Sequence, residues 1–124
     1  MPGPPTARRP CLTKYRNVYT LWSYVEIRYA WNPEKAERNY RVHGVSFEMA
    51  SGIFRDPSHI VTENYFIEDK GEQRYQAIGM SGELVLLLVV FVDRSSPGEE
   101  VIHIISARKA TAYEESVYED QFRP

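Results

Sequence analysis

The chain has few of the residues that build disulfides and metal sites. Its 124 residues include a single cysteine, Cys11, and three histidines that lie far apart, His43, His59 and His103. One cysteine excludes an intramolecular disulfide and a cysteine-based zinc cluster, and the histidines lack H-x-x-x-H spacing. We therefore expect no metal and no cofactor, and a reducing compartment such as the cytoplasm.

Long apolar segments and nucleotide-binding motifs are also missing. The longest nearly continuous apolar run, Leu84 to Val92, is far shorter than the ~20 residues that span a membrane. Because alternation is lost in this run, it predicts a central strand that is covered on both faces. The sequence contains no G-x-x-x-x-G-K-S/T, G-x-G-x-x-G or G-x-S-x-G motif, so nucleotide hydrolysis and serine hydrolase chemistry have no support.

The chain has little net charge, −2 at pH 7. Four of its 15 Lys and Arg residues precede Val25, where there is no acidic residue, and the remainder carries 11 basic against 17 acidic residues. Nucleic-acid binders are usually basic. Any RNA site in the remainder must therefore be a local patch, with the acidic residues kept elsewhere.

Residues 1–24 predict a basic extension, and residues 25–124 predict a single folded domain. Four prolines and the clustered basic residues of the first segment oppose regular structure. No small-residue cleavage site marks it as a signal peptide. A disordered, solvated tail is the favoured interpretation, and a basic arm that touches phosphates is the alternative.

The hydrophobic pattern of the domain predicts an α+β fold. Val25 to Trp31 alternates like a strand with one buried face, and Asn32-Pro33 then caps and opens a helix. A second helix begins at Ser46, and a last helix begins at Thr111, where Glu114 completes a capping box. Four more strands are predicted between these helices: His59 to Phe66, Arg74 to Met80, Leu84 to Val92 and Val101 to Ser106. This order predicts a mostly antiparallel sheet with two N-terminal helices and one C-terminal helix packed on it.

Two adjacent cations, Arg108 and Lys109, lie where the last predicted strand runs into the final helix. The small residues Ser106-Ala107 before them let a ligand approach, and a guanidinium matches a phosphate bidentately. We predict an anion site at this junction. For Arg108 the residues leave two interpretations level: a phosphate ligand, or an ion-pair partner of Glu114 or Glu115 in the final helix.

Arg74 and His103 are further candidates. Arg74 opens a strand. From the residues alone, the favoured interpretation is an arginine at the rim of the sheet that pairs with the acidic loop beside it. His103 has the side chain suited to proton transfer, and it is predicted to share a strand face with Val101 and Ile105. A half-buried structural histidine is favoured there over a general base. Metal-free RNA cleavage needs a base, an acid and cations beside the phosphoryl oxygens, which such residues supply.

Three stretches in a fixed order resemble a known family. Trp31 to Glu48 reads W-N-P-E-K-A-E-R-N-Y-R-V-H-G-V-S-F-E, Arg74 to Gly79 reads R-Y-Q-A-I-G, and Ile102 to Thr111 reads I-H-I-I-S-A-R-K-A-T. Together they resemble the BrnT family, the toxin half of a bacterial type II toxin–antitoxin pair. The resemblance covers about Val25 to Glu119, which is most of the chain.

The resemblance implies a RelE-like fold and a metal-independent RNA endonuclease. It makes Arg108 a catalytic residue, Arg74 a second catalytic or RNA-binding cation, and Lys109 a residue that steers phosphates. The chain departs from the family pattern at His103, where members often carry arginine, and at Ala112-Tyr113, where they commonly carry arginines. His103 is then a candidate general base whose pKa Arg108 would lower, and Tyr113 is a candidate to stack on an RNA base or donate a proton.

The resemblance also implies a protein partner, a BrnA-like ribbon–helix–helix antitoxin, through which the chain would contact DNA only indirectly. The acidic final helix suits a partner surface, although solvated helices of this kind are common. Two functions follow. The first is a ribonuclease toxin, and the alternative is a catalytically inactive RelE-like binding module that engages an antitoxin-like regulator. A DNA-binding regulator has less support, because no predicted helix combines a basic face with exposed polar side chains that could contact DNA bases.

Overall fold

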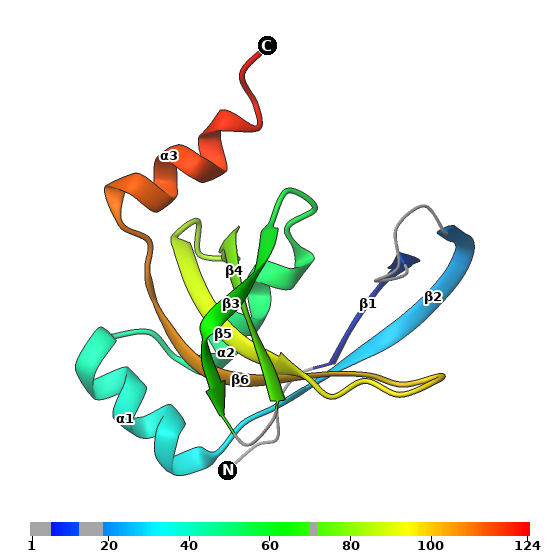
Figure 1. Ribbon diagram of the computed structural model, residues 1–124, viewed down its shortest axis with the longest axis horizontal. Coiled ribbons are helices and arrows are strands. Elements are labelled where there is room, and N and C mark those ends of the chain that lie inside the picture. The colour runs from blue at the N-terminus through cyan, green and yellow to red at the C-terminus, as the bar shows by residue number, and fades with distance from the viewer. Residues whose placement is uncertain (1–5, 13–18, 70–71) are drawn as a thin grey trace.

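The computed structural model describes residues 6–12, 19–69 and 72–124, with side chains described over 27–62 and 72–124. Within these residues one six-stranded sheet has the strand order β1-β2-β6-β5-β4-β3 (Figure 1). The strands are β1 (Thr6–Leu12), β2 (Tyr19–Ala30), β3 (Ile60–Asp69), β4 (Glu72–Met80), β5 (Leu86–Asp93) and β6 (Glu100–Lys109). The pairing of β2 with β6 is parallel and the other pairings are antiparallel. The prediction of an α+β fold with a mostly antiparallel sheet is confirmed.

The helices begin at the capping residues that the sequence predicts. The described helices are α1 (Pro33–His43), α2 (Phe47–Ser51), the 3-10 helix η1 (Gly52–Arg55) and α3 (Ala112–Asp120). Asn32 accepts from two exposed amides at the start of α1, Ser46 accepts from one at the start of α2, and Thr111 and Glu114 form a capping box at α3. Gly44, at φ 70°, ends α1 in the left-handed conformation that favours glycine.

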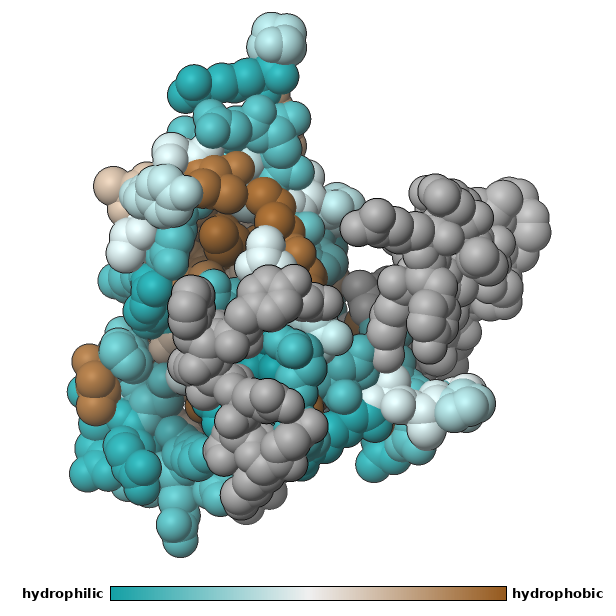
Figure 2. Space-filling model, in the orientation of Figure 1, coloured by the Kyte–Doolittle hydropathy of each residue, from teal (hydrophilic) through white to brown (hydrophobic). Residues whose placement is uncertain are grey.

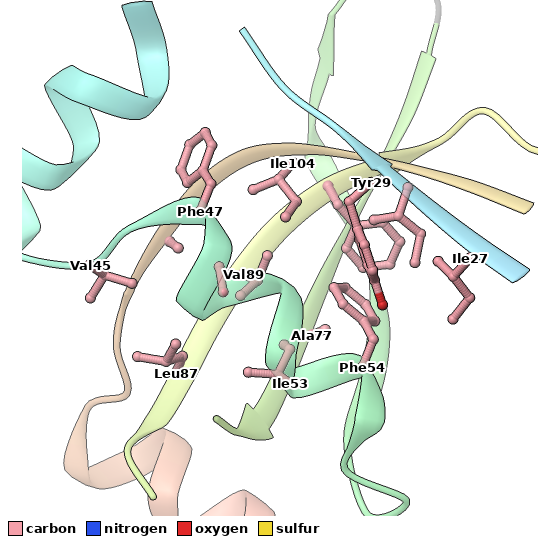
Figure 3. Close-up of a cluster of buried hydrophobic side chains, with 14 residues drawn as sticks. Ile27, Tyr29, Val45, Phe47, Ile53, Phe54, Ala77, Leu87, Val89 and Ile104 are labelled. Atoms are coloured by element: carbon pink, nitrogen blue, oxygen red, sulfur yellow. The ribbon is translucent and has the colours of Figure 1, made fainter. Parts of the chain in front are cut away.

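One face of the sheet carries the hydrophobic core, which α2 and η1 cover (Figure 3). Phe47 of α2 and Ile53 and Phe54 of η1 are buried against strand residues such as Val89 and Ile104. Close approach of η1 to β4 requires a glycine. A Cβ at Gly79 would lie 2.9 Å from the Cβ of Ile53, which leaves no room for any other residue.

Strand β5 lies between β4 and β6 and is buried on both faces. Val89 points into the core, whereas Leu88 and Val92 belong to the opposite face and are also buried. The prediction of a central strand is confirmed, although the strand begins at Leu86 rather than Leu84. Its nearly continuous apolar sequence follows from this double burial.

Part of the predicted extension, residues 1–24, is in strands. The backbone of Thr6–Leu12 forms β1 and pairs antiparallel with β2, which begins at Tyr19. Residues 1–5 and 13–18 lie outside the described residues. The sequence signal for an unstructured tail came from proline content, but Pro10 lies in β1 at the edge of the sheet, where a missing N–H is tolerated.

Helix α3 continues from β6 at the end of the chain (Figure 1), and Asp56 ties it to the body of the domain. The Tyr118 hydroxyl donates to Asp56 Oδ2 at 2.6 Å, and the backbone amides of Met80 and Ser58 donate to the same carboxylate. Burial alone would raise the pKa of Asp56, but these hydrogen bonds outweigh it and lower the pKa below its usual range. In the space-filling view, apolar atoms gather directly below α3 on an otherwise mainly hydrophilic surface (Figure 2).

Replacing Tyr118 with phenylalanine should lower the free energy of unfolding by about 1–2 kcal/mol at pH 7, because the variant loses a hydrogen bond to a charged group. The difference in unfolding free energy between parent and variant should shrink as the pH falls through the lowered pKa of Asp56. A protonated carboxyl accepts the Tyr118 hydrogen bond more weakly than a carboxylate does. Urea unfolding at several pH values measures this. Tyr113→Phe on the same helix is the control, because Tyr113 is 76% exposed. Equal effects of both variants would contradict the assignment.

Candidate functional site

Strand register brings the predicted site residues to one face of the sheet. Arg74 of β4 and His103 of β6 lie on either side of Val92 of β5, and Arg108 of β6 lies beside Leu88. Because alternate residues of a strand share a face, all three lie opposite the core. We call this surface, defined by Arg74, His103 and Arg108, the outer face. Strand spacing places the Cα atoms of Arg74 and His103 about 10 Å apart, with Arg108 roughly 13 Å farther along β6.

A β-bulge makes this arrangement possible. His103 and Arg108 are five residues apart, so in a regular strand they would point to opposite faces. The register between β5 and β6 skips Ile105, since Ser106 pairs with Val90 and Ile104 pairs with Phe91. The extra residue restores a common face for His103 and Arg108. The expectation that His103 shares a regular strand face with Ile105 is therefore wrong.

The side chain of Arg108 forms a bidentate ion pair with Glu114 of α3. Its Nη1 and Nη2 lie 2.7 and 2.9 Å from the two carboxylate oxygens. Hydrogen bonding to Arg108 lowers the pKa of Glu114, and the Thr111 amide, which donates to the same carboxylate, adds to this. Of the two interpretations that the sequence left level, the structure contains the ion pair. It also leaves Arg108 on the outer face, where a phosphate could compete with Glu114 for the same two donors.

His103 is half-buried, and its pKa lies below its usual value. Burial is the main cause that lowers its pKa, and the positive charges of Arg94 and Lys35 lower it further, while Glu72 opposes them. Arg94 Nη1 lies 3.4 Å from His103 Nδ1, and the same guanidinium pairs with Glu72 at 2.8 and 2.9 Å. The prediction of a lowered pKa is confirmed, but the positive charges responsible are Arg94 and Lys35 rather than Arg108.

The remaining candidates are more scattered. Arg74 is half-buried on the outer face, in the same cross-strand row as His103. Lys109 is exposed at the end of β6, and alternation along the strand puts it on the other face from Arg108. Tyr113 is exposed in the first turn of α3. Arg108 and Lys109 therefore do not form the double-cation cluster that their adjacency predicts.

Asn39 of α1 positions the strand that carries Arg108. Strand β2 pairs with β6 only as far as His103, so beyond that point the edge of β6 faces α1. The buried amide of Asn39 donates to the carbonyl of Ala107 at 2.8 Å and accepts from its N–H at 3.1 Å, which replaces a neighbouring strand. It also donates to the carbonyl of Val45 at 3.0 Å. These bonds give Asn39 a structural role that joins α1 to β6.

Neither a metal centre nor a membrane helix is found in the described part of the chain. No group of three or more His, Cys, Asp or Glu residues is arranged there to hold a metal ion. None of the helices described has the length and apolar character needed to cross a bilayer.

Comparison with known proteins identifies the family. A family profile described as "Ribonuclease toxin, BrnT, of type II toxin-antitoxin system" matches residues 31–114, which is more than half of the chain. The chain belongs to the BrnT family. A solved structure, that of the Brucella abortus ribonuclease toxin BrnT, is 25% identical with a TM-score of 0.46, and the alignment covers 66% of this chain and 94% of that one. A search of curated proteins finds no match.

The BrnT match confirms the resemblance drawn from the three sequence stretches. Its residues, 31–114, contain Arg74, His103, Arg108, Lys109 and Tyr113 as well as α1 and Asn39. The family consists of ribonuclease toxins of type II toxin–antitoxin systems, so RNA and an antitoxin are the partners that membership in the BrnT family implies.

Proposed function

We propose that this chain is itself an active endoribonuclease toxin with a RelE-like fold, and that it cleaves RNA without a metal ion. The observation that supports this is the outer face, where Arg74 and Arg108 flank a half-buried His103. Because the pKa of His103 lies below its usual value of about 6.5, the imidazole is available as a proton acceptor at neutral pH.

The proposed reaction is an internal transfer at phosphorus. The 2′-hydroxyl of the nucleotide attacks the neighbouring phosphodiester while His103 removes its proton. The bond from phosphorus to the 5′-oxygen breaks, leaving a 2′,3′-cyclic phosphate and a 5′-hydroxyl. Arg108 and Arg74 stabilise the charge that develops on the phosphoryl oxygens, as preorganised donors do in other enzymes. Tyr113 is the candidate to stack on a base or to protonate the leaving oxygen. Lys109 lies on the other face, so its proposed role is to steer phosphates of the RNA strand rather than to contact the reacting one.

Substrate binding in this proposal requires an exchange of partners at Arg108. The guanidinium would release Glu114 and accept a phosphate with similar bidentate geometry. Glu114 would keep its bond to the Thr111 amide, so α3 stays capped. The same ion pair is the observation that favours the second candidate, a catalytically inactive binding module in which Arg108 only anchors α3.

We propose a BrnA-like ribbon–helix–helix antitoxin as the protein partner, with DNA contacted only through it and the cytoplasm as the compartment. The partner would neutralise the toxin by covering the outer face, where Arg108 and His103 lie. Expression of the chain alone in bacteria should then stop growth and degrade RNA, and co-expression of the partner should restore growth. Purified chain that leaves RNA intact over a broad pH range would refute the nuclease and favour the binding module.

His103 gives a sharper test of the proposed chemistry. If it is the general base, the cleavage rate should rise with pH through a value below about 6.5 and level off by pH 7. His103→Gln should remove this limb and lower the rate by about a hundredfold or more. His103→Arg is the matched comparison. If the arginine variant cleaves as well as the parent while the glutamine variant is inactive, the position needs positive charge, and the base assignment fails.

The neighbours of His103 predict how the pH profile can be moved. Arg94→Gln removes a positive charge that lowers the pKa of His103 and leaves Glu72, which raises it. The rising limb of the rate profile should therefore shift to higher pH in this variant. A shift to lower pH, or an unchanged limb, would show that the limb belongs to a group other than His103.

A further inference from the structure

An open groove runs between α1 and the part of β6 beyond His103, where β6 no longer pairs with β2. Its volume is 220 Å³, and it is lined by Lys35, Arg38, Asn39, Val42, His43 and Ile105. This is smaller than the roughly 300–1,000 Å³ of small-molecule pockets. Lys35, Arg38, Val42 and His43 are also exposed to solvent. The groove therefore suits an extended segment that lies along it rather than a ligand that is enclosed.

The cations of the groove can bind a ligand without first giving up a carboxylate partner. Lys35 and Arg38 form no ion pair or side-chain hydrogen bond with any described residue, whereas Arg94 and Arg108 pair with carboxylates. Lys35, Arg38 and Val42 follow helical spacing and so share one side of α1. The acidic residues of this helix, Glu34 and Glu37, do not line the groove.

The walls of the groove strengthen its positive potential. Val42 and Ile105 contribute apolar surface beside the two cations. A cleft that is lined by charge of one sign and has apolar walls concentrates the field and attracts anions. In a chain with a net charge of −2, such a local concentration of free cations is what an anionic polymer would recognise.

The groove lies beside the part of β6 that carries His103 and Arg108. Asn39 lines the groove and is hydrogen-bonded to the backbone of Ala107, the residue next to Arg108. Ile105, the residue that the β5–β6 register skips, lines the groove and lies in sequence between His103 and Arg108. A strand of RNA with one phosphate on the outer face would have its next phosphates beside α1.

We propose that the groove between α1 and β6 binds the phosphodiester backbone of single-stranded RNA next to the nucleotide held on the outer face, with Lys35 and Arg38 as its phosphate ligands. This rests on the proposed ribonuclease function. It assigns to α1 a role in holding the substrate strand that is separate from the chemistry at His103 and Arg108.

Binding of an RNA analogue that cannot be cleaved tests the groove separately from catalysis. A 2′-O-methylated oligonucleotide lacks the attacking hydroxyl, so its fluorescence anisotropy reports binding only. For single strands each phosphate contact contributes a slope of about −0.7 to the plot of log K against log salt. Lys35→Ala and Arg38→Ala should each reduce the slope by about 0.7, and the double variant by about 1.4.

Arg41→Ala is the matched control, because Arg41 is an exposed cation of the same helix that does not line the groove. It should leave the slope unchanged. Circular dichroism should find all variants folded, since exposed side chains without ion pairs change stability by about 0.5 kcal/mol or less. Equal slopes for the parent and the double variant, or an equal loss in Arg41→Ala, would overturn the proposal.

The remaining outcomes separate the groove from the nuclease and from a protein ligand. If the slopes fall as expected but unmodified RNA is never cleaved, the groove stands and the proposed catalysis fails. If RNA is cleaved but the slopes do not change, the groove fails and the catalysis stands. Poly-glutamate serves as the probe for an acidic protein segment. If its binding depends on Lys35 and Arg38 while RNA binding does not, the groove belongs to a protein partner, and the proposal is overturned.

Discussion

Replacing Arg108 with alanine should lower RNA cleavage by about a hundredfold to a thousandfold, the range for loss of one donor that stabilises transition-state charge. The chain should stay folded, because the ion pair with Glu114 is partly exposed to solvent and such pairs contribute little. Arg108→Lys should recover little activity, since an ammonium group cannot reproduce the bidentate contact. Single-turnover cleavage of a labelled RNA, together with a thermal melt, measures both effects.

Arg123→Ala is the control for loss of an ion-paired arginine. Arg123 pairs with Asp120 at the exposed end of the chain, away from the outer face, so its removal should change neither cleavage nor stability. A second comparison, Glu114→Gln, frees Arg108 without removing it and should tighten RNA binding. If Arg108→Ala unfolds the chain while Arg123→Ala does not, Arg108 is a structural residue and its catalytic assignment is wrong.

Replacing Asn39 with alanine should lower the free energy of unfolding by about 3–5 kcal/mol, the largest stability effect that we expect from a single polar side chain here. The variant leaves three buried backbone groups without partners: the N–H and the carbonyl of Ala107, and the carbonyl of Val45. Ala107 and Val45 are 2% and 1% exposed, so water cannot replace the lost bonds cheaply. The melting temperature should fall by roughly 10 °C or more.

Tyr40→Ala is the control for this variant, because Tyr40 is the next residue of α1 and is 58% exposed. It should cost well under 1 kcal/mol. Asn39→Asp should be at least as damaging as Asn39→Ala, since a carboxylate would face the carbonyls of Val45 and Ala107 without the hydrogens that Asn39 donates. A stability loss below 1 kcal/mol in Asn39→Ala would show that α1 and β6 hold their positions by packing alone.

Local signals in the sequence predict most elements of this fold. Asn32, Ser46 and Thr111 each begin a helix as their capping chemistry predicts, and the apolar run of β5 marks the centre of the sheet. These features depend on residues within a few positions of one another. The strand β1 and the start of β2 were missed, because their pairing depends on a partner strand that no short-range pattern reveals.

The site was predictable as a set of residues but not as an arrangement. The sequence identified Arg74, His103 and Arg108, yet the run Ile104-Ile105-Ser106 contains no glycine that would mark a bulge. Arg94 and its pairing with Glu72 depend on strand register, which alternation alone does not determine. The groove at α1 was missed for the same reason, since it forms only where α1 meets β6.

The bulge at Ile105 also determines which genetic changes this chain can tolerate. Substitutions between His103 and Arg108 alter a side chain but keep the number of residues, so both functional candidates stay on the outer face. A deletion or insertion of one codon changes that number. Every side chain on one side of the change then points to the opposite face of the sheet. Natural relatives should therefore keep the number of residues between these two positions constant, even where individual side chains between them differ.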